Sequence, residues 1–375
     1  MNGRDTKHFI IISCGGTGGH LAPGIAVGEQ LAQRGLGVIY LINDKAVASH
    51  FMATPGYEFR ALPEIKYRKI WSICAWSVLA EMLKSIQGIL KLYFGYRIVH
   101  VLSAGGGAGI LPVLIYRLLG VPVSLLEQNA VMGQANRFLM KFARKVYLTF
   151  PCVNVGASPK MKLTGNPVRG SLDSPVLSKK EACQRLNLKE DRFTFLIMGG
   201  SQGAKRLNEF ALAIMEKMTG IIKQGQVIHL VGKYLLEECR NLYRKLNIPF
   251  YCEEFCQDML PVYTLADFAI SRAGGGGIAE LLIFNIPSVF VPFPYATEEH
   301  QHVNAQWVEK NGCGWMMEEK ELFSEAGTER LSGLLNDSVA QLECKKRQKQ
   351  HARPGAAREV AEGILEEVDK RGMQG

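Results

Sequence analysis

Four glycine-rich turns contain the residues of this sequence that are best suited to chemistry. They lie at residues 15–20 (GGTGGH), 103–109 (SAGGGAG), 199–203 (GGSQG) and 271–277 (SRAGGGG). Each turn follows a short apolar run and precedes a segment with helical periodicity. Glycine lets backbone N–H groups approach a ligand closely, and a helix N-terminus favours negative charge. The pattern therefore predicts binding of a phosphate-bearing ligand.

The first turn does not fit the dinucleotide-binding pattern GxGxxG cleanly. The acidic residue that such a fold needs after its second strand would have to be Asp44. A nicotinamide-dependent dehydrogenase is therefore disfavoured. Turns that merely reverse the chain remain an alternative for one or two of the four, but they do not explain why all four precede helices.

Short runs rich in valine and isoleucine position these turns. Because the runs lack period-two alternation, they indicate strands buried on both faces of a parallel sheet. Strands are predicted at residues 9–14, 38–42, 98–102, 121–126, 145–149, 193–198, 227–231, 268–271 and 288–291. Helices are predicted at residues 22–33, 111–119, 132–142, 204–218, 234–246, 277–284, 300–310 and 356–370. The fold class is therefore α/β, with two doubly wound parallel sheets that face each other across a cleft.

Two prolines and two glycines break the alternation at residues 165–175. Such a segment is typical of a domain boundary. We expect an N-terminal domain of residues 1–168 and a C-terminal domain of residues 169–350. We further expect a C-terminal helix within residues 351–375 that packs back on the N-terminal domain.

Composition and charge exclude several classes of protein for this chain. Of 375 residues, 47% are hydrophobic and 21% are charged, which excludes a disordered chain. Residues 1–168 hold 18 Lys and Arg against 7 Asp and Glu, so the positive charge of this basic chain lies in its first half. No run reaches the length of a membrane-spanning helix, and the scattered cysteines predict no metal site. A membrane surface or a polyanion is expected to meet the first half, and no nucleic-acid partner is expected.

Six segments occur in the order seen in a known family. They are residues 15–20 (GGTGGH), 126–129 (LEQN), 165–169 (GNPVR), 199–204 (GGSQGA), 271–280 (SRAGGGGIAE) and 291–305 (VPFPYATEEHQHVNA). By these segments the chain resembles the MurG family of peptidoglycan glycosyltransferases. The resemblance implies the GT-B fold and a transfer that needs no cofactor. It also implies two substrates, UDP-N-acetylglucosamine as donor and the undecaprenyl-pyrophosphoryl muramyl-pentapeptide, lipid I, as acceptor.

The donor residues follow from the resemblance. It places the C-terminal donor residues at Arg169, Ser201, Gln202, Cys256, Gly275, Gly276, Gly277, Glu280, His300 and Gln301, and adds Thr17, Gly18, Gly19 and Asn129 from the N-terminal domain. Without a metal, the diphosphate charge must be met by N–H groups and a cation, here Arg169. A carboxylate such as Glu280 accepts two ribose hydroxyls, and the amide of Gln301 suits sugar hydroxyls. A linker salt bridge for Arg169 and a solvated helix position for Glu280 remain the alternatives.

The acceptor half offers one candidate base. His20 follows the first turn, and a histidine can take the proton of the attacking muramyl 4-hydroxyl near neutral pH; helix capping or a phosphate contact is the alternative. The resemblance implies that Gly105, Gly106 and Gly107 form the acceptor loop. The chain departs from the family here, because Leu126 replaces a histidine and the second turn lacks the usual tyrosine and serine.

Aromatic and basic residues gather at residues 66–97. Trp71 and Trp76, with Lys69 and Lys84, suit the boundary of an anionic bilayer. The apolar stripe at residues 79–90 is expected to pack at least partly on the sheet. We expect a peripheral protein on the cytoplasmic side of the bacterial inner membrane.

Two other functions remain open from the sequence. One is another metal-independent GT-B enzyme, either a UDP-sugar transferase to a different acceptor or a UDP-sugar epimerase. The other is a weakly active UDP-sugar-binding scaffold that organises wall enzymes. The changes in the acceptor half motivate both alternatives.

Overall fold

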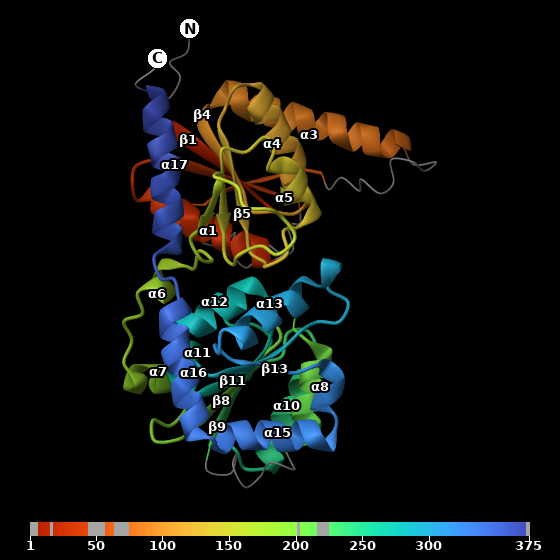
Figure 1. Ribbon diagram of the computed structural model, residues 1–375, viewed down its shortest axis with the longest axis vertical. Helices are drawn as coiled ribbons and strands as arrows, with labels where there is room; N and C mark the ends of the chain where they lie inside the picture. The colour runs from red at the N-terminus through yellow and green to blue at the C-terminus, as the bar shows by residue number, and fades with distance from the viewer. Residues whose placement is uncertain are drawn as a thin grey trace. The chain divides into compact units, whose positions relative to one another are not determined.

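The computed structural model describes residues 7–15, 18–43, 57–63, 75–200, 203–215 and 225–372. They belong to two compact units (Figure 1). The first unit holds the chain up to Gly170 and again from Gly355 onward. The second unit is Ser171–Pro354.

The first unit is built on seven parallel strands in the order β3-β2-β1-β4-β5-β6-β7. The strands are β1 His8–Cys14, β2 Gly37–Ile42, β3 Glu58–Ala61, β4 Arg97–Ser103, β5 Val123–Glu127, β6 Lys145–Leu148 and β7 Met161–Leu163. The helices are α1 Gly18–Ala32, α3 Ala75–Gly95, the 3-10 turn η2 Gly107–Gly109, α4 Ile110–Leu118, α5 Gln134–Leu139 and α17 Ala356–Gly372.

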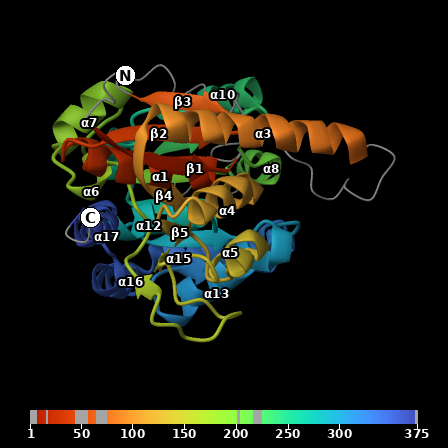
Figure 2. The same ribbon diagram turned by 90° about the horizontal axis from the view of Figure 1, so that it is seen from above.

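Strand β1 shows why this sheet is covered on both faces. Phe9 and Ile11 pack in one apolar cluster with residues of α3, α4 and α5. Ile10 and Ile12 point the other way, into a cluster with residues of α1 and α17. Figure 2 shows α3 and α4 together, and Figure 1 shows α17 running beside α1. The continuous apolar run of this strand therefore encodes two cores rather than one.

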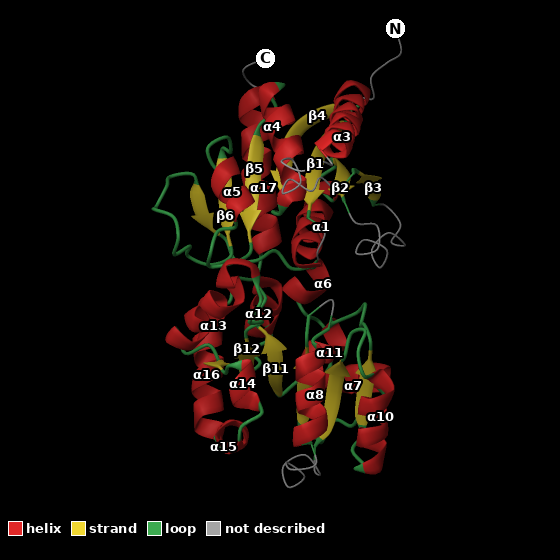
Figure 3. Cartoon of the chain, turned by 90° about the vertical axis from the view of Figure 1, so that its right-hand side faces the viewer, coloured by secondary structure: helices red, strands yellow, loops and turns green. Residues whose placement is uncertain are grey.

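The second unit repeats the plan with six parallel strands in the order β10-β9-β8-β11-β12-β13. Figure 3 labels two neighbouring strands of this sheet, β11 and β12. The strands are β8 Thr194–Met198, β9 Gln226–Leu230, β10 Phe250–Glu253, β11 Phe268–Arg272, β12 Ser288–Val291 and β13 Trp315–Met316. The helices are α6 Gly170–Asp173, α7 Lys179–Leu186, α8 Lys205–Ile214, α10 Leu236–Lys245, α11 Leu260–Leu265, α12 Gly275–Ile283, the 3-10 turn η3 Thr297–Glu299, α13 His300–Lys310, α14 Glu319–Leu322, α15 Glu325–Asn336 and α16 Ser338–His351.

The two parallel sheets confirm the predicted fold class. The strands that the sequence analysis did not predict are β3, β7, β10 and β13, which are the edge strands of the two sheets. Helix α1 begins at Gly18, four residues before the predicted start, so Gly18 and Gly19 of the first turn are its first residues.

A buried histidine joins three elements of the second unit. His229 on β9 has its Nδ1 2.8 Å from the Tyr243 hydroxyl and its Nε2 3.1 Å from Asn208 Oδ1. The Asn208 amide donates to the carbonyls of Val231 and Tyr234, which leaves its oxygen to accept from Nε2–H. The Tyr243 hydroxyl then donates to the bare Nδ1, so the ring is held neutral.

The second unit should therefore lose stability in acid. Burial lowers the pKa of His229 from 6.5 to about 3. Between those values the unfolded chain binds a proton that the folded chain does not, so stability falls as the pH drops through this window. Replacing His229 with glutamine should flatten the dependence of unfolding free energy on pH by about 1.4 kcal/mol per pH unit. Urea titrations from pH 7 to pH 4 measure this slope.

The control is Val339→Gln, because Val339 is 77% exposed in the same unit and the change adds or removes no titratable group. That change should leave the slope as it is in the parent chain. An unchanged slope in His229→Gln would contradict the neutral buried network.

Candidate functional site

The two glycine-rich turns of the first unit and the loop that carries Asn129 follow neighbouring strands. β1, β4 and β5 lie side by side in the sheet, and all three are parallel. Their carboxyl ends therefore meet at one edge, where ligands of open α/β sheets bind. The loops after β4 and β5 carry Gly105 and Asn129, and His20 lies in the first turn of α1, which follows β1.

His20 lies against the backbone of two of these loops. A Cβ atom on Gly15 would be 2.7 Å from the ring Nδ1, and one on Gly105 would be 3.2 Å from the ring Cδ2. Gly105 and Gly106 also have φ angles of +97° and +76°, which favour glycine. Glycine, which has no side chain, is therefore the residue that fits next to this imidazole at these positions. The structure thus brings the predicted base together with the first two residues of the predicted acceptor loop, and Gly107 begins η2 directly after them.

Glu127 at the end of β5 organises the third loop. Its Oε1 accepts from the backbone N–H and the side-chain amide of Asn129, at 3.1 and 3.3 Å. Its Oε2 accepts from Gly133 N at 3.0 Å and from Asn136 Nδ2 at 2.9 Å. Burial raises the pKa of this carboxyl, and the bonds from Asn136, Gly133 and Asn129 oppose that rise. A buried carboxylate with four N–H contacts fixes the loop that carries Asn129.

The two neighbours of Glu127 in the chain, Gln128 and Leu126, lie in different surroundings. The Gln128 amide donates to the Ala104 carbonyl at 2.8 Å, which links the loops after β4 and β5. Leu126 is buried in the apolar cluster that also contains residues of α1 and α17. The leucine that replaces the family histidine is therefore a core residue.

Four further predicted residues belong to the first unit. Gly18 and Gly19 open α1, whereas Thr17 lies outside the described residues. Arg169 is half-buried at the end of the unit, where its positive charge opposes the raised pKa of Tyr57.

In the second unit the loop after β8 presses on the loop after β9. A Cβ atom on Gly203 would be 2.5 Å from the Val231 carbonyl oxygen, and the φ angle of Gly203 is +75°. Only glycine is compatible with this close approach and this φ angle. Ser201 and Gln202 of the same loop lie outside the described residues.

Glu280 is held by a residue that the sequence analysis missed. Gly275, Gly276 and Gly277 form the first turn of α12, and Glu280 follows on the same helix. The hydroxyl of Tyr263, a buried side chain on α11, donates to Glu280 Oε2 at 2.5 Å. A tyrosine in an apolar helix carries no sequence signal for this role, because the contact depends on how α11 and α12 pack.

The remaining predicted donor residues occupy two loops of the second unit. Cys256 is buried, with its thiol 3.0 Å from the Asp258 carbonyl oxygen. His300 and Gln301 open α13, and Gln301 Oε1 accepts from the Phe293 N–H at 3.0 Å. That bond holds the oxygen of the Gln301 amide and leaves its NH₂ group for another partner. Nothing in the structure tests the ligand contacts of these residues, so their donor roles stay predictions.

These groups suit particular parts of a ligand. The N–H groups at the start of α12 and after β8 match phosphate oxygens, and a carboxylate such as Glu280 matches vicinal hydroxyls. Among the described residues, no three His, Cys, Asp or Glu side chains lie close enough together to hold a metal ion.

Comparison with known proteins decides the family. The glycosyltransferase family 28 N-terminal domain matches residues 10–148, and the C-terminal domain of the same family matches residues 194–360. A relative from Thermodesulfovibrio yellowstonii is 31% identical over 95% of this chain and 98% of its own length. It is named UDP-N-acetylglucosamine--N-acetylmuramyl-(pentapeptide) pyrophosphoryl-undecaprenol N-acetylglucosamine transferase. The chain belongs to this transferase family, the MurG family.

Other relatives agree with this assignment. A Rickettsia felis protein of the same name is 31% identical over 88% of this chain and 91% of its own length. The crystal structure of Acinetobacter baumannii MurG matches with a TM-score of 0.75 and 25% identity, over 96% of this chain and 99% of that one. A UDP-N-acetylglucosamine 2-epimerase shares the fold, with a TM-score of 0.64 and 12% identity over 98% of both chains. The MurG family resemblance inferred from the sequence motifs is confirmed.

Glu127→Gln should loosen the loop after β5 in this MurG family member. Glutamine replaces one carboxylate oxygen with an NH₂ group, which cannot accept a hydrogen bond. Because each oxygen of Glu127 accepts two bonds, two N–H donors lose their acceptor in either orientation of the amide. Leaving buried donors unsatisfied costs about 1–3 kcal/mol. We expect a lower melting temperature and faster amide exchange at residues 128–136.

Glu362→Gln is the control, since Glu362 makes only a surface pair with Arg34 at 3.6 Å and its side chain is 55% exposed. Its melting temperature should match that of the parent chain. Unchanged exchange at residues 128–136 in Glu127→Gln would show that the carboxylate does not hold the loop.

Proposed function

We propose that this chain transfers N-acetylglucosamine from UDP-N-acetylglucosamine to the muramyl 4-hydroxyl of lipid I, which forms lipid II with inversion at the anomeric carbon. The observation that most directly supports this proposal is the match over 98% of the length of a relative whose name states both substrates. No separate domain of that relative is missing from the alignment. This coverage supports a chain that uses both substrates.

The second unit supplies the chemistry expected of a donor site. The diphosphate would be met by N–H groups from the loop after β8 and from the first turn of α12, which need no reorganisation when charge develops on the leaving group. Glu280, oriented by Tyr263, would accept the ribose hydroxyls. Gln301, with its oxygen held by Phe293, would present its NH₂ group to the sugar.

The first unit supplies the candidate base. Attack on the anomeric carbon requires removal of a proton from the acceptor hydroxyl, and the imidazole of His20 can accept it. Gly15, Gly105 and Gly106 lie next to its ring and leave the partly buried imidazole accessible to an acceptor. We therefore assign His20 as the general base and the loop of Gly105, Gly106 and Gly107 as the neighbouring acceptor contact.

A transfer assay tests this proposal. The purified full chain, given radiolabelled UDP-N-acetylglucosamine and lipid I, should form lipid II. His20→Ala should lower kcat by about 10²–10⁴-fold, the usual contribution of a general base. Binding of UDP, measured by calorimetry, should stay within about twofold of the parent value, because the base contributes to proton transfer and not to nucleotide binding.

His351→Ala is the control, since His351 ends α16 and stacks edge-on against Trp307. It should keep the parent rate. Donor turnover on another acceptor without lipid II, or epimerisation of the donor, would refute the proposed reaction. Full turnover in His20→Ala would refute the assignment of the base alone.

We also propose that the first unit binds the cytoplasmic face of the inner membrane through α3. No helix in the described part of the chain meets the length and hydropathy of a membrane span. The undecaprenyl chain of lipid I lies in a bilayer, so an enzyme that uses it must reach the bilayer surface.

Helix α3 has a buried side and an exposed side. Val78, Ile89 and Leu92 are buried in the unit, whereas Phe94 near the end of the helix is 65% exposed. In its first half Trp76 is 81% exposed and Leu83 is 58% exposed, with exposed Lys84 beside them. Figures 1 and 2 show this half extending beyond the sheet. Exposed apolar and basic side chains on one helix support contact with an anionic bilayer. Lys69 and Trp71 lie outside the described residues.

Leu83→Ser combined with Trp76→Ala should weaken binding to vesicles that contain anionic phospholipid, because less apolar surface enters the interface. Flotation assays should show at least a several-fold loss of bound protein. Leu342→Ser in the second unit is the matched control, since Leu342 is 56% exposed on α16. Equal loss in the control, or none in the α3 variant, would contradict α3 as the contact.

A further inference from the structure

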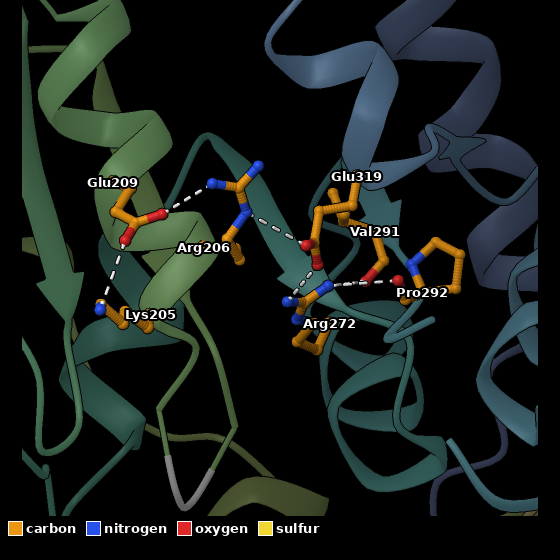
Figure 4. Close-up of polar contacts among 7 residues, drawn as sticks. All are labelled: Lys205, Arg206, Glu209, Arg272, Val291, Pro292 and Glu319. Atoms are coloured by element: carbon orange, nitrogen blue, oxygen red, sulfur yellow. Dashed lines mark hydrogen bonds and ion pairs between the residues drawn. The ribbon is translucent and has the colours of Figure 1, made fainter. Parts of the chain in front are cut away.

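One carboxylate in the second unit joins the segments that carry the glycine-rich loops. Glu319 is the first residue of α14, and its Oε2 is 2.7 Å from Nη2 of Arg272. Its Oε1 is 3.3 Å from Nε of Arg206. Figure 4 shows Glu319 between the two arginines. Arg272 is the last residue of β11, directly before the turn into α12. Arg206 is the second residue of α8, directly after the loop that follows β8.

Arg272 brings in a third segment. Its Nη1 is 3.4 Å from the Val291 carbonyl oxygen and 3.2 Å from the Pro292 carbonyl oxygen. Its guanidinium carbon lies 5.3 Å from the centre of the Phe293 ring. These residues end β12 and begin the loop to Gln301, whose oxygen bonds the Phe293 N–H. Three segments of the proposed donor site thus meet at one ion pair.

The ion pair of Glu319 with Arg272 is buried, whereas its ion pair with Arg206 is exposed, so the two differ in strength. The Arg272 and Glu319 side chains are only 8% and 16% exposed, so removing either partner leaves a largely buried charge unpaired. Arg206 is 52% exposed and also pairs with Glu209 at 2.9 Å. Surface pairs of that kind contribute little. The bond between Arg272 and Glu319 is therefore the one that fixes the geometry.

The partners of Arg272 also define its role. Its guanidinium faces a carboxylate, two carbonyl oxygens and an aromatic ring, all of which belong to the protein. Its positive charge is balanced by Glu319 and its N–H groups are aimed at fixed acceptors. A cation held this way orients the backbone around it.

We propose that Glu319 is a positioning residue for the nucleotide-sugar donor. Through Arg272 it sets the relative placement of the loop before α12 and the loop after β12, and through Arg206 it adds the start of α8. This inference rests on the proposed function, since it assumes that those loops bind the donor. Glu319 touches neither the reacting atoms nor the acceptor site in this account, so its loss should weaken donor binding and leave the chemical step intact.

The test compares Glu319→Gln and Glu319→Ala with a control from the same short helix. Glu321→Gln is that control, because Glu321 pairs with Arg330 at 2.8 Å and its side chain is 32% exposed. Each full-length variant is titrated with UDP by calorimetry. Each is then assayed for transfer with the donor and the acceptor varied separately, and its melting temperature is recorded.

We expect Glu319→Ala to raise the Kd for UDP and the KM for the donor by about tenfold to a hundredfold, the effect of misplaced binding groups. Glu319→Gln should raise both by less, because the amide oxygen still accepts from Arg272. The KM for the acceptor and kcat at saturating donor should stay within about twofold in both variants. Glu321→Gln should match the parent chain in every measurement.

Each other result counts against a specific statement. A lower melting temperature in both Glu319 variants, with the parent Kd and KM retained, would show a role in stability only and overturn the inference. Failure of the parent chain to bind UDP or to form lipid II would overturn the proposed function instead. If Glu319→Ala does not fold, Glu319→Gln decides, since an unchanged Kd for UDP and an unchanged donor KM in that variant overturn the inference.

Discussion

Parallel pairing places every loop of this protein that leaves a strand's carboxyl end at one edge of its sheet. Both sheets are parallel throughout, so binding groups must come from those loops or from the first turns of the helices after them. Such loops offer N–H groups only if the backbone folds back closely, and side chains would prevent that at Gly105 and Gly203. The glycine content of the turns is thus a consequence of the topology, and the chemistry of each unit depends on it.

Three carboxylates make hydrogen bonds or ion pairs beside these glycine-rich loops. Glu127 collects four N–H bonds within one loop, Glu280 is held by a tyrosine hydroxyl from the preceding helix, and Glu319 pairs with arginines from two elements. Each is at least half-buried or bonded to a buried partner, so its bonds are less exposed to competition from water. Glu127 and Glu319 thus bond to residues of, or next to, the loops at the strand ends, and Glu280 is itself held in place by Tyr263.

The sequence predicted the layers of the fold well because central parallel strands are apolar throughout. It missed β3, β7, β10 and β13, which at two to four residues on sheet edges carry too few apolar positions to form a pattern. The position of His20 beside its glycine turn was predictable because that signal is local, whereas its role as the base stays a prediction. Tyr263 and Glu319 were not predictable, because their partners Glu280 and Arg272 are 17 and 47 residues away and only packing joins them. Leu126 proved to be a core residue, which no local pattern distinguishes from a loop residue at a strand end.

The central claim is that the glycine-rich loops of the second unit offer their N–H groups to a nucleotide diphosphate. Amide hydrogen exchange of the full chain with and without UDP measures those groups directly. The account predicts slower exchange at residues 199–204 and 273–278 when UDP is bound, with no change at residues 128–136 of the first unit. Protection confined to the first unit, or absent from both loops at saturating UDP, would contradict it.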